Sequence, residues 1–322
     1  MVDCCLKCGQ RPAAGSKLRM CGGCHTAKYC TDLCQRGHWS EHKPVCKTLG
    51  AARERVVYSL ALAAQDGDLA AATKLLETGN VNKAMADGRT ALFMAVQRGH
   101  LALVAALLDA GAKVNRTVVF QTIHGGSTTP LIMAAYGGHL AVVKALLQAG
   151  AEIENAPWEG LTPLYVAAEK GHTAVVKVLL EAGADAGVAV DKPRAVGDTA
   201  LFAATRSGSE MVVKMLLEAG ADANRAGNNG FAPLQMAVYG GHLAVVKALL
   251  GSGADIHKTH SDGHTVLIVA VACDHLAVVE VLLEAGADAK VINNKGFTAL
   301  SVAMRDGKAA ILAALQRHER SG

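Results

Sequence analysis

Long apolar runs are missing from this sequence of 322 residues. Gly, Asp, Glu and Lys interrupt every apolar stretch before it reaches the roughly 18 residues that a membrane-spanning helix needs. The first residues, Met1 to Cys4, also lack the apolar segment of a secretion signal. We therefore expect an intracellular protein of the cytoplasm or nucleus that does not enter a membrane.

Aromatic residues are also scarce, at 4% of the chain, although 51% of the residues are apolar. Leu, Ala and Val supply most of the apolar fraction. A composition of this kind favours thin layers of small helices over one thick core. It also excludes extensive disorder away from the chain ends.

Catalytic motifs are the third absence. The sequence contains no Gly-rich phosphate loop, no His-Glu-x2-His helix, no nucleophile elbow and no recurring pair of carboxylates. We therefore assign no catalytic residue and expect that the protein is not an enzyme. A role as a subunit of an enzyme complex is kept as an alternative.

Cysteine is almost confined to one end of the chain, because eight of the nine cysteines precede residue 47 and Cys273 is the other. Clustered pairs of this kind without a secretion signal indicate metal ligands in a reducing compartment and argue against disulfides. The paired donors are Cys5 with Cys8, Cys21 with Cys24, Cys30 with Cys34, and His42 with Cys46.

These four pairs supply enough donors for two Zn²⁺ ions with four ligands each. Such closed sites leave no coordination position for water or substrate, so both ions are expected to be structural. Cys4 competes with Cys5 for the first position, and we favour Cys5 because its Cys-x2-Cys spacing is the commoner zinc knuckle. His25 and His38 are not assigned as ligands.

The order of the pairs, with Tyr29, Gln35, Trp39 and Lys43 between them, resembles the MYND-type zinc finger over residues 5–46. The resemblance implies that the pairs interleave. One zinc would then be held by Cys5, Cys8, Cys30 and Cys34, and the other by Cys21, Cys24, His42 and Cys46. It also implies that Gln35 and Trp39 form a shallow groove for a short proline-containing peptide. The alternative role of Trp39 is to cover the metal site, because so small a module has little other core.

Positive charge is concentrated in the same segment, where residues 1–50 contain eight Lys and Arg against three Asp and Glu. Thiolates and bound Zn²⁺ together reduce this excess. The basic residues also lack the spacing of a DNA-recognition helix. We therefore favour protein partners, and keep a nucleic-acid-associated regulator acting through the basic finger as the alternative.

Behind this segment one pattern recurs with a period of 33 residues. The typical copy contains Gly-His, then Leu-Leu, then Gly-Ala, as in residues 171–184. The leucines that align between copies are Leu92, Leu131, Leu164, Leu201, Leu234, Leu267 and Leu300. With Thr-Pro-Leu at residues 162–164, the pattern resembles the ankyrin repeat over residues 52–318. The resemblance implies a mainly α solenoid built of helix-turn-helix units with β-hairpins.

We divide the chain into the finger at residues 5–46, a linker at 47–52, an N-terminal capping unit at 53–83 and seven repeats at 84–322, the last of them a C-terminal cap.

Within a unit, Thr is expected to cap the first helix, with Pro at the first helical position. Gly183 is expected to end its helix in a left-handed conformation. Asp274 stands where the other units have Gly, which predicts a strained turn. Cys273 is interpreted as a small, buried or half-buried filler.

Two steps between aligned leucines exceed the period, at 39 residues from Leu92 to Leu131 and 37 residues from Leu164 to Leu201. Because insertions in repeat arrays go to exposed loops, we place them at hairpin tips, within residues 116–128 and 188–193. The first is apolar and rich in β-formers. It either extends as a partner-binding finger or folds over the adjacent unit.

A docking face is expected along the hairpin tips and the exposed side of the first helices. Our hypothesis assigns Leu161, Phe231, Tyr239 and Phe297 to it, because large apolar residues at the tips and aromatic and charged residues on the helices share this face, a mixture that interfaces favour. Ordinary scatter of surface residues is the alternative. The leading functional hypothesis is an adaptor whose finger binds a peptide and whose array docks a second protein.

Overall fold

The structure is a computed structural model. It describes residues 60–321 except 78–79, 86, 120–125, 186–189, 196, 228–229 and 261, together with two short strands nearer the N-terminus. These strands, β1 (Arg19–Met20) and β2 (Lys28–Tyr29), pair in antiparallel fashion, with Arg19 opposite Tyr29. In the described part of the chain, no helix has both the length and the apolar character needed to cross a bilayer.

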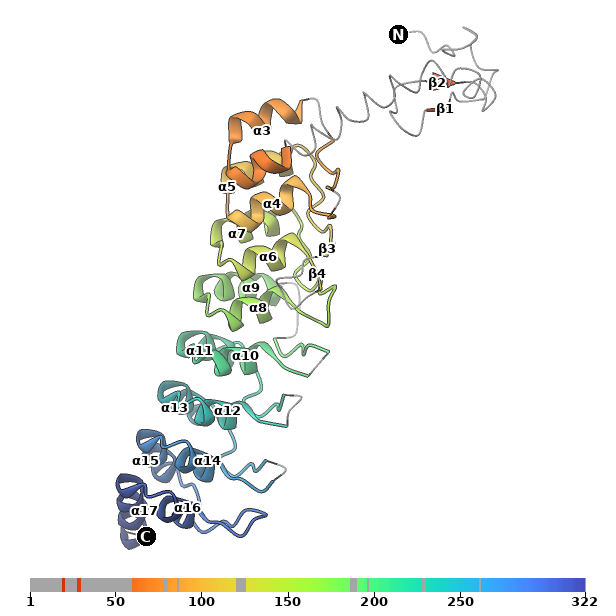
Figure 1. Cartoon of the computed structure of the whole chain (residues 1–322). Helices are drawn as coiled ribbons and strands as arrows, with labels where there is room; N and C mark the ends of the chain where they lie inside the picture. The colour runs from red at the N-terminus through yellow and green to blue at the C-terminus, as the bar shows by residue number, and fades with distance from the viewer. Residues whose placement is uncertain are drawn as a thin grey trace.

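Pairs of short antiparallel helices stack in single file, with the loops that join successive pairs on one side of the stack (Figure 1). A helical stretch at residues 60–66 and helix α3 (Leu69–Leu76) precede seven such pairs within residues 91–321. We number these pairs as units 1 to 7. They are α4 (Ala91–Arg98) with α5 (Leu101–Asp109), α6 (Pro130–Tyr136) with α7 (Leu140–Gln148), α8 (Pro163–Glu169) with α9 (Thr173–Asp185), α10 (Ala200–Ser207) with α11 (Glu210–Glu218), α12 (Pro233–Tyr239) with α13 (Leu243–Gly251), α14 (Val266–Ala272) with α15 (Leu276–Glu284), and α16 (Ala299–Arg305) with α17 (Ala309–Ser321).

In six of the seven units the first helix begins after a Thr whose hydroxyl accepts a hydrogen bond from a free backbone amide of the first turn. In unit 3 the Thr162 hydroxyl accepts a hydrogen bond from the Tyr165 amide at 3.1 Å, and Pro163 occupies the first turn. The predicted cap is therefore confirmed there. In unit 5, where Ala232 replaces Thr, the Gln235 side chain accepts from the Ala232 amide at 2.8 Å instead.

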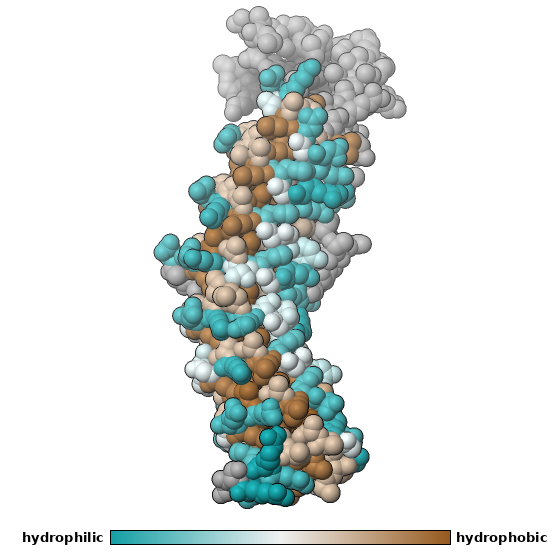
Figure 2. Space-filling model, turned by 90° about the vertical axis from the view of Figure 1, so that its left-hand side faces the viewer, coloured by the Kyte–Doolittle hydropathy of each residue, from teal (hydrophilic) through white to brown (hydrophobic). Residues whose placement is uncertain are grey.

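The apolar core is continuous from one unit to the next. Buried residues from both helices of a unit pack against those of its neighbours, as Leu146 and Leu216 do from second helices. On the side of the stack that carries the second helices, apolar residues form a band along its length, with polar residues on both sides (Figure 2). A single unit could not bury this surface alone, so stacking stabilises every unit.

A glycine after each of several first helices contacts a histidine of the next unit. The imidazole Nε2 of His172 lies 3.0 Å from the Tyr136 carbonyl oxygen of the preceding unit. Its ring packs on Gly138, which has a φ of +67°, so closely that a Cβ there would lie 2.8 Å from the ring. The same arrangement joins Gly67 to His100, Gly99 to His139, Gly208 to His242 and Gly241 to His275.

Unit 6 departs from this arrangement, as the sequence predicts. Asp274 adopts the left-handed conformation of the glycines, with a φ of 62°. Because Asp carries a Cβ, a histidine ring in the next unit would be crowded, and unit 7 has Lys308 there. The Lys308 amine donates to the carbonyl oxygens of Val271 at 2.7 Å and Ala272 at 2.6 Å. Cys273 is half-buried, and burial raises the pKa of its thiol, although the Lys308 charge opposes this.

The longer insertion begins and ends as a hairpin. Strand β3 (Val118–Val119) pairs with β4 (Ser127–Thr128), with Val118 opposite Thr128. The Val118 side chain is buried, whereas Val119 is 66% exposed. The base of the hairpin also lies on unit 3, because a Cβ on Gly126 would overlap the Trp158 ring. Residues 120–125 lie outside the described residues, so a partner-binding role of the tip stays a prediction.

The shorter insertion is not where we placed it. Helix α9 has 13 residues, whereas α5, α7, α11, α13 and α15 have 9 each. The four additional residues therefore form one more turn of helix, and the predicted hairpin-tip location is wrong. Gly183 lies within this helix, so the prediction that it ends the helix is also wrong. The residues around Gly183 do not by themselves explain the extra turn, because the same sequence, Leu-Leu-Glu-Ala-Gly-Ala-Asp-Ala, stands at residues 216–223 and 282–289, where α11 ends at Glu218 and α15 at Glu284.

Candidate functional site

The zinc ligands and the groove residues predicted in the finger, namely Cys5, Cys8, Cys21, Cys24, Cys30, Cys34, His42, Cys46, Gln35 and Trp39, lie outside the described residues. The described strands flank part of this set, since β1 ends directly before Cys21 and β2 ends directly before Cys30. An antiparallel pair that brackets a Cys-x2-Cys segment suits a zinc knuckle, and the donor set is one that Zn²⁺ prefers. Among the described residues, no group of three or more His, Cys, Asp or Glu side chains could hold a metal ion.

The C-terminal ends of the first helices of units 2 to 5 carry aromatic and charged side chains, which we call the inner ridge: Tyr136, Glu169, Lys170, Arg206 and Tyr239. The Lys170 amine of unit 3 lies 4.8 Å from the centre of the Tyr136 ring of unit 2. Glu169 of unit 3 pairs with Arg206 of unit 4 at 2.7 Å. These contacts join side chains of neighbouring units, and the sequence alone did not show that they meet. They preorganise the ridge without covering it.

Tyr239 continues the inner ridge in unit 5, where its side chain is 63% exposed. Its backbone carbonyl oxygen lies 3.3 Å from Nε2 of His275, which fixes the end of the helix that carries the ring. An exposed tyrosine on a fixed backbone offers a large apolar surface and one hydroxyl to a partner. This geometry agrees with the predicted docking role of Tyr239, which stays a prediction.

Two other predicted docking residues are partly exposed and held by stacking contacts. The Phe231 ring stacks on the His260 ring with 4.2 Å between centroids. The Arg305 guanidinium lies 5.0 Å from the centre of the Phe297 ring. The Phe231 ring is therefore contacted by the hairpin of the next unit, and the Phe297 ring by helix α16 of its own unit, so neither ring is wholly exposed.

Leu161 does not belong to the docking face, and its assignment is corrected. Its side chain is 1% exposed and packs in the core. The hairpin before it turns sharply, with Glu159 and Gly160 both at positive φ and the Leu161 amide bonded to the Trp158 carbonyl oxygen at 2.8 Å. This turn directs Leu161 between the units. Thr128, at the equivalent position of unit 2, is also buried.

A group of ionisable residues lies in the hairpin before α14, between the hairpins that carry Phe231 and Phe297. Asp262 lies 2.7 Å from Nδ1 of His264 and 3.2 Å from Nδ1 of His260. Burial by itself raises the pKa of Asp262, but hydrogen bonds from the two histidines outweigh it and lower the pKa to about 2 from the ordinary 3.8. The carboxylate therefore stabilises this hairpin above pH 3.8 and loses that contribution as the pH falls toward 2.

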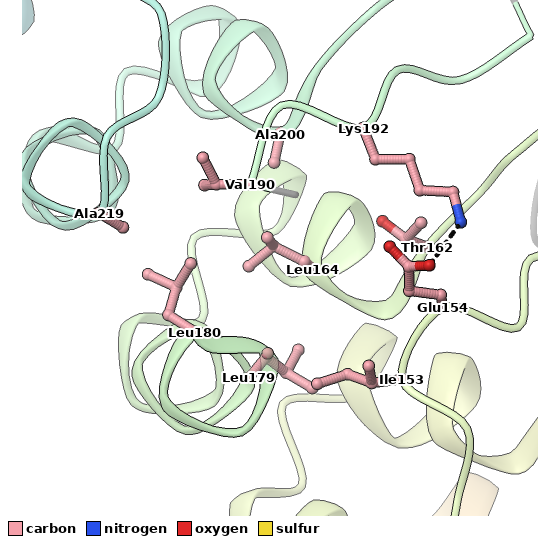
Figure 3. Close-up of a pocket in the computed structure, with 11 residues that line it drawn as sticks. Ile153, Glu154, Thr162, Leu164, Leu179, Leu180, Val190, Lys192, Ala200 and Ala219 are labelled. Atoms are coloured by element: carbon pink, nitrogen blue, oxygen red, sulfur yellow. Dashed lines mark ion pairs between the residues drawn. The ribbon is translucent and has the colours of Figure 1, made fainter. Parts of the chain in front are cut away.

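A cavity of about 320 Å³ lies between units 3 and 4 (Figure 3). Side chains from α8 and α9 and from the loop after α9 point into it. The apolar wall consists of Ile153, Leu164, Leu179, Leu180, Val190, Ala200 and Ala219. At one edge, next to Thr162, the Lys192 amine pairs with Glu154 at 3.2 Å. No signal in the sequence predicted this cavity.

The extra turn of α9 explains why the cavity is large. The equivalent space beside Leu267 in unit 6 measures only about 40 Å³, and Ala287 lines it directly after helix α15 ends. In unit 3 the chain continues as helix at the corresponding point, through Gly183. Leu164 is partly exposed, whereas its counterparts inside the stack, Leu92, Leu131, Leu201, Leu234 and Leu267, are buried; Leu300, in the last unit, is also partly exposed.

Asp191, in the loop beside this cavity, replaces an asparagine that links units elsewhere. In unit 4 the Asn224 side chain accepts from the Asp255 amide at 2.7 Å and donates to the Gly253 carbonyl oxygen at 3.0 Å. Asp191 accepts from the Asp222 amide at 2.9 Å, but its buried Oδ1 has no hydrogen-bond partner among the described residues. A carboxylate cannot donate to the carbonyl that an amide would reach.

We therefore expect Asp191→Asn to stabilise the array. The new amide supplies the missing donor to the Gly220 carbonyl oxygen, which should raise the free energy of unfolding by about 1 kcal/mol. Asn224→Asp is the matched control and should lower stability by a similar amount, because it creates the same unpaired oxygen one unit further along. Urea unfolding of both variants checks the pair. Equal midpoints for the wild type and Asp191→Asn would contradict the assignment.

Comparisons with known proteins agree with this architecture. A family model described as ankyrin repeats matches residues 42–118, 118–190, 186–260 and 234–320, and the model of the MYND finger matches residues 5–46. The crystal structure of the human ASB11 ankyrin repeat domain is similar at 30% identity and a TM-score of 0.61, over 71% of this chain and 98% of that one. The ankyrin repeat domain of Bcl-3, titled a unique member of the IκB protein family, is similar at 28% identity and a TM-score of 0.62, over 71% and 99%.

Proposed function

Because the chain belongs to the ankyrin-repeat family and carries a MYND finger, we propose that it is a non-catalytic adaptor that joins two protein partners. Both kinds of module are protein-interaction modules. The observation that carries the proposal is that the two occur in one chain and that the array presents a preorganised ridge of aromatic and charged side chains. We place this adaptor inside the cell, where thiolate ligands stay reduced.

The finger would bind the first partner. Two structural Zn²⁺ ions would fold it, and Gln35 and Trp39 would bind a short proline-containing peptide. An indole supplies flat apolar area that matches a proline ring, and a glutamine amide supplies a donor and an acceptor for the peptide backbone. Because both metal sites would be closed, the ions would support recognition and not hydrolysis.

The array would dock the second partner on the inner ridge and the adjoining hairpins. Tyr239 would be the central contact, because it is the most exposed aromatic residue in the described part of the predicted face. Phe231 and Phe297 would add apolar area at its edges, and the Glu169–Arg206 pair would add polar contacts. Aromatic anchors with charged neighbours at the rim are the usual composition of protein interfaces.

Linking the two sites would strengthen both. A linker as short as residues 47–52 keeps the peptide site close to the array, so binding at one site raises the effective concentration of a partner complex at the other. The gain can reach about 10²-fold or more where one complex reaches both sites. Assembly of two proteins on one chain would thus be the output of the adaptor.

Affinity capture from nuclease-treated cell lysate, read by mass spectrometry, tests the proposal. The full-length chain is compared with a Gln35→Ala, Trp39→Ala double variant and with Tyr239→Glu. We expect the finger variant to lose one set of captured proteins and Tyr239→Glu to lose another, because a buried charge at the centre of an interface is costly. Dissociation constants for the recovered proteins then measure each loss.

Two controls make the comparison specific. Met211→Glu places the same charge on an apolar residue that is 58% exposed on α11, on the side of the stack away from the inner ridge, and should retain every partner. The finger variant should keep its zinc content, so that a lost partner reflects the groove. Retention of all partners by Tyr239→Glu would show that the docking face lies elsewhere, and loss of all capture on nuclease treatment would favour nucleic-acid binding.

A further inference from the structure

Irregular features of the array gather at the junction of units 3 and 4. The extra turn of α9 and the cavity beside it occur there. Glu159, a residue with a Cβ, has a φ of 45°. Buried polar atoms of Asp191 and Arg194 lack hydrogen-bond partners among the described residues, although Arg194 pairs with Glu159 through another nitrogen at 3.2 Å. Strain and unpaired polar atoms cluster where a fold serves a second purpose.

We propose that the cavity between units 3 and 4 binds a small, neutral, apolar molecule. Its wall is aliphatic, and its polar groups already have partners. Glu154 and Lys192 pair with each other, and the Thr162 hydroxyl accepts from the Tyr165 amide. A ligand with a charged head would have to break the ion pair, whereas a neutral one leaves it intact at the rim of the cavity (Figure 3).

The size of the cavity sets the size of the ligand. At about 320 Å³ it falls at the lower end of the range of small-molecule sites, roughly 300–1,000 Å³. An apolar cavity of about 150 Å³ accommodates benzene. This one therefore fits a molecule of about twice that volume, such as an eight-carbon alcohol or a fused pair of aromatic rings. The equivalent space in unit 6, about 40 Å³, has room for neither.

The site is separate from the proposed docking face. Thr162 and Leu164, which line the cavity, lie at the start of α8, and Glu169 of the inner ridge lies at its end. Seven residues of α-helix place these ends about 10 Å apart. A ligand in the cavity therefore does not compete with a partner on the ridge, and the inference stands or falls independently of the adaptor role.

Titration of the full-length protein with 1-octanol, followed by methyl NMR, tests the proposal. We expect saturable shifts confined to methyl groups of Leu164, Leu179, Leu180 and Val190, and a rise in melting temperature that increases with ligand concentration. Octanoate and octylammonium have the same chain length and carry opposite charges. Both should bind more weakly than 1-octanol, because each competes with one member of the Glu154–Lys192 pair.

Ala219→Phe provides the blocking variant, since Ala219 is exposed at the rim and its replacement leaves the core intact. It should abolish the saturable shifts. Ala285→Phe is the matched control, because Ala285 is the exposed residue at the same position of unit 6, and it should bind like the wild type. No saturable shift in the wild type, equal binding by both variants, or tighter binding of either charged probe would overturn the proposal.

Discussion

Gly138→Ala should lower the free energy of unfolding of the array by about 2–5 kcal/mol. The left-handed φ of +67° costs a residue with a Cβ about 1–2 kcal/mol. The new methyl group would also lie 2.8 Å from the His172 ring, and overpacking of this kind costs about 1–3 kcal/mol. Moving the ring away would lengthen its 3.0 Å contact with the Tyr136 carbonyl oxygen. Urea unfolding and amide hydrogen exchange at units 2 and 3 measure the effect.

Gly307→Ala separates the two contributions. Gly307 has nearly the same φ, +68°, but a Cβ there would meet nothing within 4 Å among the described residues. It should therefore cost only the conformational part, about 1–2 kcal/mol. In the Gly138→Ala background, His172→Ala should cost less than it does in the wild type, because the ring no longer collides with the methyl group. Equal losses for Gly138→Ala and Gly307→Ala would contradict the proposed link between units.

Removing zinc should unfold the finger and leave the array folded. Structural Zn²⁺ contributes about 10–16 kcal/mol of apparent binding free energy in small finger domains, and a segment of this size has no core that could replace it. After treatment with a strong chelator, NMR signals from residues 5–46 should collapse to random-coil positions. The far-ultraviolet circular dichroism of the helices should change little. Elemental analysis of the untreated protein should give about two zinc ions per chain.

A double variant distinguishes the two ways in which the cysteine pairs could be combined. If the pairs interleave, Cys8 and Cys30 share one ion, and the Cys8→Ser, Cys30→Ser variant should keep about one zinc per chain. If neighbouring pairs combine instead, this variant damages both sites and both ions should be lost. Cys273→Ser is the control and should keep both ions, because Cys273 lies in unit 6. Ordered signals from the finger after complete chelation would contradict a structural role of the metal.

Predictions from capping preferences and from positive φ were correct where a single residue determines the conformation of a helix end or turn. Thr162 and Pro163 predicted the start of α8, and Asp274 predicted a strained turn, because caps and positive φ depend on a residue and its immediate neighbours. The same preferences failed at Gly183, because an identical local sequence ends the second helix at a left-handed glycine in units 4 and 6 but continues as helix in unit 3. The spacing between aligned leucines shows that residues are inserted, but it does not show whether they lengthen a helix or a loop.

The docking face shows the same division. The sequence predicted a row of aromatic and charged positions, and Tyr239 is exposed in that row. It could not show that Leu161 is buried, because the direction of this side chain depends on the turn at Glu159 and Gly160 and on the neighbouring hairpin. Nor could it show the contact between Lys170 and Tyr136, whose partners belong to different units.

The sequence by itself determined the family, the mainly helical fold and the set of residues that suits zinc, because repeat period, cap chemistry and ligand spacing are properties of short segments. Tertiary structure alone decided the cavity between units 3 and 4, the burial of Leu161 and the contacts that join glycine to histidine across units. The physical reason is that stacking brings together side chains about one repeat apart. Whether the space between two units is filled depends on the path of both backbones, which no single segment specifies.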